Sequence, residues 1–404
     1  MHVITKSIGL EGVIVTNWTY HNRTIQIHVE LPKRRHTCPA CQRKTRRIHD
    51  YRIQKLDHLK QAERWTVVFY RKRRYACSCG KRFAESAPFV ARYQRQTIEW
   101  NQMLTLKVVK AKTFTDTAES AGTSPTTVMR RFDTLAAPQW KAVTELPPVI
   151  AIDEYKGDTR AGKFQLIIAD PVTRQPLDIL PDRRADTLKA YLREKGQRVT
   201  TVVMDMSHSF KHAVNQALGR PVIIADRFHY CRYVYWALER VRRQVQQSFD
   251  DYDRKTCKRM RHVFYKREAK LTAKQRWHLE RFLAKSDDLR QAHALKESFC
   301  VWLDQAKERG DQDLATTKTS LHAFYRKVKK SGLDAFLSAI QTLQNWQPEI
   351  MNSFAYGYTN GFVEGLNNQT KVLKRNAFGF QRFDRFRMRI LLHHQYKDIK
   401  TGIG

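Results

Sequence analysis

Three acidic residues stand where the chain could hold divalent metal ions. Asp153 ends the apolar run Val149–Ile152 and Asp205 ends Val202–Met204, so each carboxylate should emerge at the carboxyl end of a buried strand. Glu364 should lie in the opening turn of a helix. Carboxylate oxygens are the ligands that Mg²⁺ or Mn²⁺ takes when a pair of these ions drives phosphoryl transfer. We therefore predict Asp153, Asp205 and Glu364 as metal ligands and catalytic residues.

Asp226 competes with these residues for a metal role, because it ends another strand-like run, Val222–Ala225. A lone aspartate at a strand end is often only the cap of the next turn, whereas neighbouring carboxylates repel each other unless a cation compensates. His229 should lie over Asp226 on one helical turn. We favour a supporting role for Asp226 and His229, and leave open that Asp226 is a metal ligand itself.

Several side chains near the acidic residues are suited to phosphate. An amide and two cations recur on the face of the Glu364 helix at three- to four-residue spacing, and two arginines precede a helix amino end. The alternative for the first group is a solvated polar stripe. The predicted phosphate contacts are Arg183, Arg184, Asn368, Lys371 and Arg375.

The charge of the chain favours a polyanionic partner. Its 74 Lys and Arg residues against 39 Asp and Glu give a net charge of +35, which suits nucleic acid better than a small acidic substrate. A basic solvated surface is the alternative. Hydrophobic residues make up 42% of the 404 residues, enough for two or three folded domains. Without a signal-peptide pattern or an apolar run of about 20 residues, we expect a cytoplasmic, nucleoid-associated protein and no membrane partner.

Four of the seven cysteines form two close pairs. In a reducing compartment such pairs indicate Zn²⁺ rather than disulfides, and a tetrahedral site would join two β-rich segments whose own core is small. His36 or His49 could replace one thiolate, and unligated thiols are the alternative. The predicted zinc ligands are Cys38, Cys41, Cys77 and Cys79.

Residues 115–131 match a helix-turn-helix pattern. Gly122 permits the tight turn, and Thr123 or Ser124 would cap the second helix. An ordinary pair of antiparallel helices is the alternative, because many such pairs share these spacings. The residues expected to face the major groove are Thr126, Thr127, Arg130 and Arg131.

The order of expected elements predicts the fold of the rest of the chain. Strand signals at 149–153, 164–169 and 176–180 are followed by helix, strand, helix and strand, with the last two strands at 201–205 and 221–225. This is the order of an α/β ribonuclease-H-like sheet. Helical, basic sequence then continues to about residue 350.

We expect five parts along the chain. These are a small β-rich zinc-binding module (1–96), a helix-turn-helix domain (97–147), the first part of a ribonuclease-H-like catalytic core (148–230), a helical insertion (231–350) and the final part of the core with the Glu364 helix (351–404).

Four motifs in this order resemble those of the DDE transposases of bacterial insertion sequences: Ile152–Glu154, Val203–Asp205, Ala225–His229 and Asn360–Asn368. The resemblance covers nearly the whole chain and is closest to the ISL-three family (insertion sequence L-three), whose members also carry a zinc-finger module and a helix-turn-helix. It implies that Asp153, Asp205 and Glu364 are the catalytic triad. Asp226 with His229 looks like the DxxH signature of several eukaryotic DDE superfamilies.

We therefore expect a transposase that binds the terminal inverted repeats of its own element, cuts DNA and joins the freed 3′-hydroxyl to target DNA. Double-stranded DNA is the expected partner, with self-association on it. One alternative is a non-catalytic DNA-binding regulator, which would have no use for three acidic residues aimed at one place. The other is a metal-dependent nuclease that cuts without strand transfer.

Overall fold

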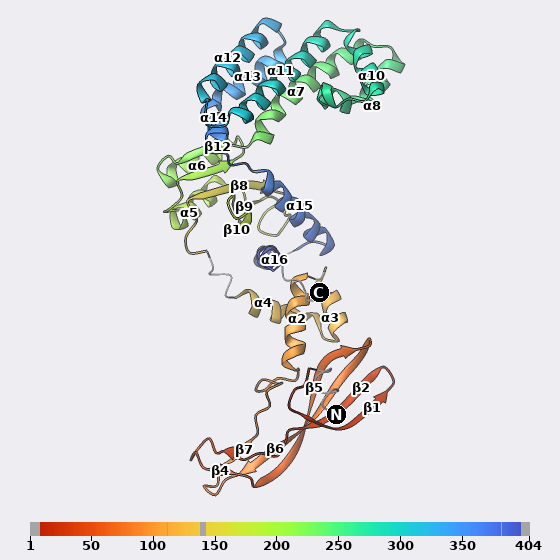
Figure 1. Ribbon diagram of the computed structural model, residues 1–404, viewed down its shortest axis with the longest axis vertical. Helices are drawn as coiled ribbons and strands as arrows, with labels where there is room; N and C mark the ends of the chain where they lie inside the picture. Colours follow the sequence, from red (N-terminus) through yellow and green to blue (C-terminus); the bar gives the residue numbers. More distant parts are fainter. Residues whose placement is uncertain (1–8, 111, 138–142, 381, 397–404) are drawn as a thin grey trace. The chain divides into compact units, whose positions relative to one another are not determined.

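The computed structural model describes residues 9–110, 112–137, 143–380 and 382–396 (Figure 1). The chain divides into two compact units. Unit 1 comprises Met1–Gln139 with Tyr396–Gly404, and unit 2 comprises Trp140–Gln395. Within the described ranges, none of the helices combines the length and apolar character that a membrane crossing requires.

Unit 1 is built on a five-stranded sheet with strand order β1-β2-β6-β5 and β7 added to β6. Alternate residues of β2 and β6 are buried, so Ile25, Ile27 and Val68 share one core, in agreement with the β-rich character expected of residues 1–96. β3 and β4, which lie between β2 and β5 in the sequence, form a separate two-stranded sheet. The strands are β1 (Ile14–His21), β2 (Thr24–Glu30), β3 (His36–Thr37), β4 (Lys44–Thr45), β5 (Ile48–Gln61), β6 (Arg64–Ala76) and β7 (Arg82–Ala84).

The tight turn expected between two helices of unit 1 is present. Gly122 ends α3 in the left-handed conformation at φ 65°, and Ser124 caps α4 by accepting a hydrogen bond from the Thr127 N–H. Of the two caps considered, Ser124 rather than Thr123 fills the position. The helices are α2 (Ile98–Lys110), α3 (Phe114–Ala121) and α4 (Pro125–Ala136).

Unit 2 contains a second five-stranded sheet with strand order β10-β9-β8-β11-β12. β8, β9 and β10 are antiparallel neighbours, whereas β11 is parallel to both β8 and β12. The carboxyl ends of β8, β11 and β12 therefore meet at one edge. The strands, which confirm the expected elements, are β8 (Val149–Tyr155), β9 (Gln165–Asp170), β10 (Gln175–Leu180), β11 (Thr201–Met204) and β12 (Val222–Ala225).

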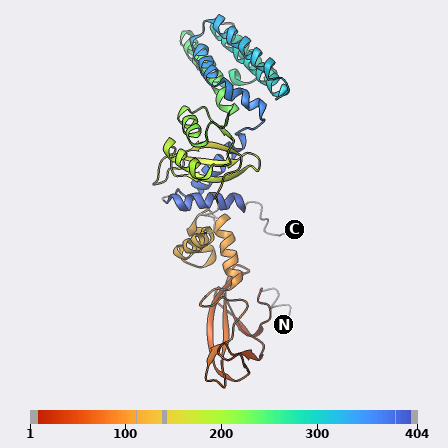
Figure 2. The ribbon, with the colours of Figure 1, turned by 90° about the vertical axis from the view of Figure 1, so that its left-hand side faces the viewer.

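Helices cover both faces of this sheet (Figures 1 and 2). Because side chains alternate along a strand, Ile150 and Ile152 pack under α5 (Ala185–Lys195) and α6 (His208–Leu218). Ala151, between them, faces α15 (Gly361–Asn376) and α16 (Phe383–Gln395) on the other side. Unit 2 is thus a three-layer α/β/α structure in which the last layer comes from the end of the chain.

A bundle of helices separates β12 from α15 in the sequence, as expected for residues after 227. Its core contains Tyr230, Phe299, Phe336 and Trp346, each at most 1% exposed. The elements are α7 (Arg227–Val245), η2 (Gln246–Ser248), α8 (Asp251–Arg259), α9 (Arg261–Tyr265), η3 (Glu268–Lys270), α10 (Ala273–Leu283), α11 (Asp287–Arg309), α12 (Leu314–Ser331), α13 (Asp334–Asn345) and α14 (Gln347–Ala355).

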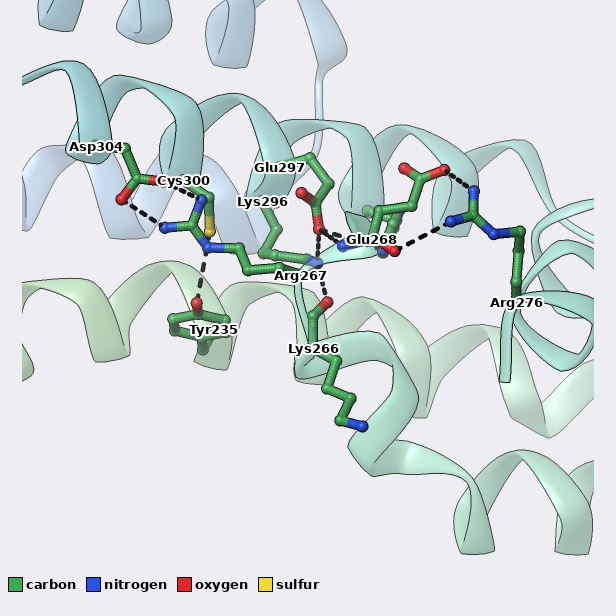
Figure 3. A network of polar contacts seen from close by, with 10 residues as sticks. Tyr235, Lys266, Arg267, Glu268, Arg276, Lys296, Glu297, Cys300 and Asp304 are labelled. Atoms are coloured by element: carbon green, nitrogen blue, oxygen red, sulfur yellow. Dashed lines mark hydrogen bonds and ion pairs between the residues drawn. The ribbon is translucent and has the colours of Figure 1, made fainter. Parts of the chain in front are cut away.

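Charged side chains fasten the irregular segment after α9 to helix α11 (Figure 3). Arg267 donates to both carboxylate oxygens of Asp304, over 2.7 and 3.0 Å. The fully buried Lys296 ammonium donates to the Lys266 carbonyl oxygen over 2.9 Å and to Glu297. These partners compensate a cation that would be costly to bury alone.

We expect Gly122→Ala to destabilise unit 1. The added Cβ would lie 2.3 Å from the Trp65 ring, and φ 65° costs a non-glycine residue about 1–2 kcal/mol. The free energy of unfolding, measured by urea denaturation, should fall by roughly 2–4 kcal/mol. Gly219→Ala is the control, because φ is 70° there and nothing lies within 4 Å of the added Cβ. Equal losses in the two variants would contradict the contact with Trp65.

Candidate active site

Three aspartates lie at the carboxyl edge of the unit 2 sheet. In the pairing of β8, β11 and β12, Asp205 stands level with Asp153 on one side and with Asp226 on the other. The backbone N–H of Asp226 donates to the Met204 carbonyl over 2.9 Å, which fixes this level. The parallel strands therefore deliver three carboxylates to one place.

The environment of these aspartates opposes their ionisation. Burial raises the pKa of Asp153 to about 7, and the charges of Asp205 and Asp226 contribute to the rise. Burial likewise raises the pKa of Asp205 to about 6, and the charges of Glu154 and Asp226 add to the rise. The Oδ1 atom of Asp205 is buried and accepts no hydrogen bond. A cation at this edge would relieve the repulsion and give that oxygen a partner.

Asp226 and His229 are close but form no ion pair. His229 Nε2 lies 3.7 Å from Asp226 Oδ2, beyond normal hydrogen-bond distance. Burial lowers the pKa of His229 to about 4, so its ring is neutral near pH 7. Arg232 donates to His229 Nδ1 over 3.2 Å, which leaves the ring proton on Nε2, facing Asp226. Burial also raises the pKa of Asp226, and the charge of Glu364 adds to this rise.

Asn367 is a site residue that the sequence analysis missed. It is 4% exposed, and its amide donates to Asp153 Oδ2 over 2.8 Å, which orients that carboxylate. Asn360 donates to the Ile152 carbonyl over 3.5 Å. The signal that could have revealed Asn367 is its position among Val363, Leu366 and Thr370, because an amide on the buried face of a helix needs a partner.

Glu364 lies in the first turn of α15 on the exposed side of the helix. Asn360, which precedes the helix, and Asn367 within it donate to Ile152 and Asp153, so the opening turns that carry Glu364 lie at the same edge as the aspartates. Asn368, Lys371 and Arg375 are exposed on the same helix and continue the face expected from their spacing.

The remaining arginines expected at phosphate differ from one another. Arg183 Nη1 lies 3.1 Å from Glu154 Oε2, and its guanidinium stacks over Phe164, so a carboxylate already pairs with it. The Arg184 side chain, at the amino end of α5, is 81% exposed, with its Nε 3.9 Å from Asp182 Oδ2.

The four cysteines of unit 1 converge into one cluster. Among the residues that the structure describes, they alone form a group of three or more potential metal ligands whose ligand atoms all lie within 4.8 Å of one another. The Sγ atoms of Cys38 and Cys79 are 3.7 Å apart, and those of Cys41 and Cys77 are 3.5 Å apart. Tetrahedral Zn²⁺ with bonds of about 2.3 Å requires sulfur separations of about 3.8 Å, so the cluster fits zinc.

The second helix of the helix-turn-helix presents only part of its expected surface. Thr126 and Arg130 are exposed. The Thr127 hydroxyl is 3.0 Å from the Ser124 hydroxyl, and Arg131 donates to Gln94 Oε1 over 2.7 Å. Arg131 therefore holds α4 to the preceding segment in addition to any contact with a ligand.

Comparisons with known proteins agree over most of the chain. Residues 150–390 match the ISL3 family model for DDE enzymes, described as transposase. Residues 34–79 match the zinc-finger of transposase IS204/IS1001/IS1096/IS1165, and residues 85–136 match the helix-turn-helix domain of transposase family ISL3. These matches confirm the resemblance and the order of zinc, helix-turn-helix and transposase segments.

Two curated proteins are similar to this chain. The transposase for insertion sequence element IS1001 of Bordetella parapertussis is 24% identical over 383 residues, which cover 91% of each chain. A protein of Lactococcus lactis subsp. lactis named ATP-dependent protease is 32% identical over 116 residues. That second match covers 29% of this chain and 34% of the relative, too little to show a family.

We expect one zinc ion per chain, lost when a ligand is removed. Cys38→Ser should release the metal and lower the unfolding temperature of unit 1, because the cluster joins two turns that have little core between them. Zinc content by mass spectrometry of metal-replete protein tests this expectation. Cys257→Ser, a buried thiol of α8, is the control and should keep the full zinc content.

We also expect the metal-free chain to lose stability as the pH rises. The pKa of folded Asp153, about 7, lies above the value of about 3.9 for an unfolded aspartate. The stabilising contribution is therefore complete below about pH 4 and disappears as the pH rises through about 7. Relative to Asp153→Asn, the wild-type chain should lose on the order of 2–4 kcal/mol across this range. Urea unfolding in chelator would contradict this expectation if the difference between the two proteins were independent of pH.

Proposed function

This chain belongs to the ISL3 family of transposases, and from that premise we propose that Asp153, Asp205 and Glu364 form its catalytic triad. As a member of the family it is a DDE-type insertion-sequence transposase with a zinc ribbon and a DNA-binding helix-turn-helix. The observation that carries the proposal is the level placement of half-buried Asp153 and Asp205 on adjacent parallel strands, next to the helix that bears Glu364.

We propose a ribonuclease-H-like fold for the catalytic core. Three antiparallel strands followed by two parallel ones, with helices on both faces, support this assignment. The proposed core runs over 148–230 and 351–404, with the insertion 231–350 between its parts and the modules 1–96 and 97–147 before it. The insertion would leave the core intact because it joins β12 to α15 at the edge of the sheet.

The acidic residues fit two divalent cations better than one. They do not form a group of three ligand atoms within 4.8 Å, whereas two ions about 3.5–4 Å apart would accept ligands over a wider span. We propose Mg²⁺ or Mn²⁺, because all three ligands are carboxylates. When bound, these ions would lower the pKa of water and stabilise charge on the scissile phosphate.

The residues of the chain would position the reactants. Asn367 would orient the Asp153 carboxylate for the metal site, since its amide donates to Oδ2 while the Glu154 backbone N–H donates to Oδ1 over 2.8 Å. Lys371 and Arg375, exposed beyond Glu364 on α15, would bind phosphates on either side of the cut. Asp226 and His229 would support the site, and Arg184 and Asn368 would extend the DNA contact.

Unit 1 would bind the terminal inverted repeats of the element. Thr126 and Arg130 are exposed on α4, where base edges in a major groove would be read. A cavity of about 830 Å³ in the same unit is lined by Lys72, Lys81 and Arg92, and this charge suits a phosphate backbone. Because an element has two ends, we propose that the protein self-associates on DNA and acts in the nucleoid, where the ends and the target lie.

The test of the triad is Glu364→Gln, which keeps the size of the side chain and removes its charge. Cleavage and strand transfer with Mg²⁺ should fall by about 10³-fold or more, while binding of the element ends should persist because unit 1 carries it. Glu308→Gln, which alters an exposed carboxylate of α11 in the insertion, is the control and should leave both unchanged. A folded Glu364→Gln protein that cuts near the wild-type rate would remove Glu364 from the triad.

A further inference from the structure

Helix α7 carries a row of aromatic and cationic side chains on its solvent side. Phe228 and Trp236 are 56% and 51% exposed. Arg232 lies between them, with its guanidinium carbon 5.7 Å from the Phe228 ring centre and 4.5 Å from that of Trp236. Exposed Arg240 continues the row at the same four-residue spacing. Scattered exposed aromatics are ordinary, but a contiguous row is typical of an interaction surface.

The helix that carries these rings is packed firmly into the helical bundle. The opposite side of α7 is anchored in the core of the bundle by Tyr230, Val234 and Leu238, all fully buried. Tyr233 packs edge-on against Trp236, with ring centres 5.5 Å apart at 73°. The row therefore presents its aromatic surface without the loss of freedom that ordering a loop would cost.

The row begins at the carboxylate edge. Asp226 is the residue before α7, and His229 in its first turn links Asp226 to Arg232 through the contacts of 3.7 and 3.2 Å. Burial raises the pKa of Asp205, and the charge of Arg232 offsets part of this rise. Arg232 thus acts on the acidic site and on the aromatic row together.

We propose that Phe228, Arg232 and Trp236 bind an unpaired base of the DNA strand, next to the phosphate held at Asp153, Asp205 and Glu364. Bases stack on aromatic rings and guanidinium planes whatever their sequence. The positive charge of the row suits a nucleic acid, and its continuity with the acidic edge favours the DNA that is being cut. The inference rests on the proposed function.

The kinetic test uses a duplex bearing the element end, either fully paired or with one unpaired nucleotide beside the scissile phosphate. Trp236→Ala should slow single-turnover cleavage of the paired duplex by about 10- to 100-fold at saturating protein, as expected when one stacking contact is lost. On the unpaired duplex the loss should shrink to about 3-fold or less, because no base must be extruded during the reaction. Trp236→Phe should stay near wild type on both duplexes.

Trp277→Ala is the matched control. Trp277 is 57% exposed on α10 and also lies beside an arginine, Arg281, at 5.7 Å, but it belongs to another part of the bundle. It should cut both duplexes at the wild-type rate. If Trp236→Ala cuts the paired duplex normally, loses equal activity on both duplexes, or loses self-association instead, the inference is wrong.

A second measurement does not depend on cleavage. Wild-type protein in chelator is irradiated with single-stranded oligothymidine that carries one 5-iodouracil, and the cross-linked peptide is identified. Cross-links at Phe228 or Trp236 that disappear in the alanine variants support the inference. If they form although Glu364→Gln protein cuts near the wild-type rate, the proposed triad is wrong and the base site stands. If no cross-link maps to α7, the base site is wrong.

Discussion

The repulsion between partly buried carboxylates at one edge of the unit 2 sheet is the constraint on which the rest of the structure depends. The parallel register of β8, β11 and β12 forces Asp153, Asp205 and Asp226 to the same level. Nothing in the hydrophobic layers favours this arrangement, since burial raises the pKa of each of the three. It is tolerable where a cation compensates, and the amide of Asn367 and the proton of His229 Nε2 face the same edge.

Unit 1 meets a different constraint, the small size of its core. Its sheet buries few side chains, and the turns that bear the two cysteine pairs lie at strand ends, where hydrophobic contacts are sparse. Four sulfur atoms at zinc-binding distance replace the missing core there. The helix-turn-helix packs on the sheet in another way, because its turn at Gly122 contacts the Trp65 ring of β6. Glycine, which has no Cβ, stands at the position where any side chain would collide with that ring.

Helix α7 connects the acidic edge of unit 2 with its helical bundle. Its first turn reaches the carboxylate edge through His229, while its buried side belongs to the core of the helical bundle. A long insertion between β12 and α15 therefore does more than lengthen the chain. It holds Phe228, Arg232 and Trp236 on a helix that is packed into a hydrophobic core beside the acidic site. A loop of similar length would not provide such a support.

The sequence by itself determined the elements and where along them the candidate acidic residues stand, because periodicity, caps and turn residues are local. The strand that carries Asp153, the strand that ends just before Asp205, the cap at Ser124 and the cysteine pairs all follow from residues within a few positions of each other. Only the tertiary structure decided that Asp226 stands level with Asp205, that Asn367 rather than Asn368 reaches Asp153, and that Glu154 pairs with Arg183. These contacts join residues far apart in the chain. The strand order, the strand register and the helix rotation that create them are set by the packing of the whole core.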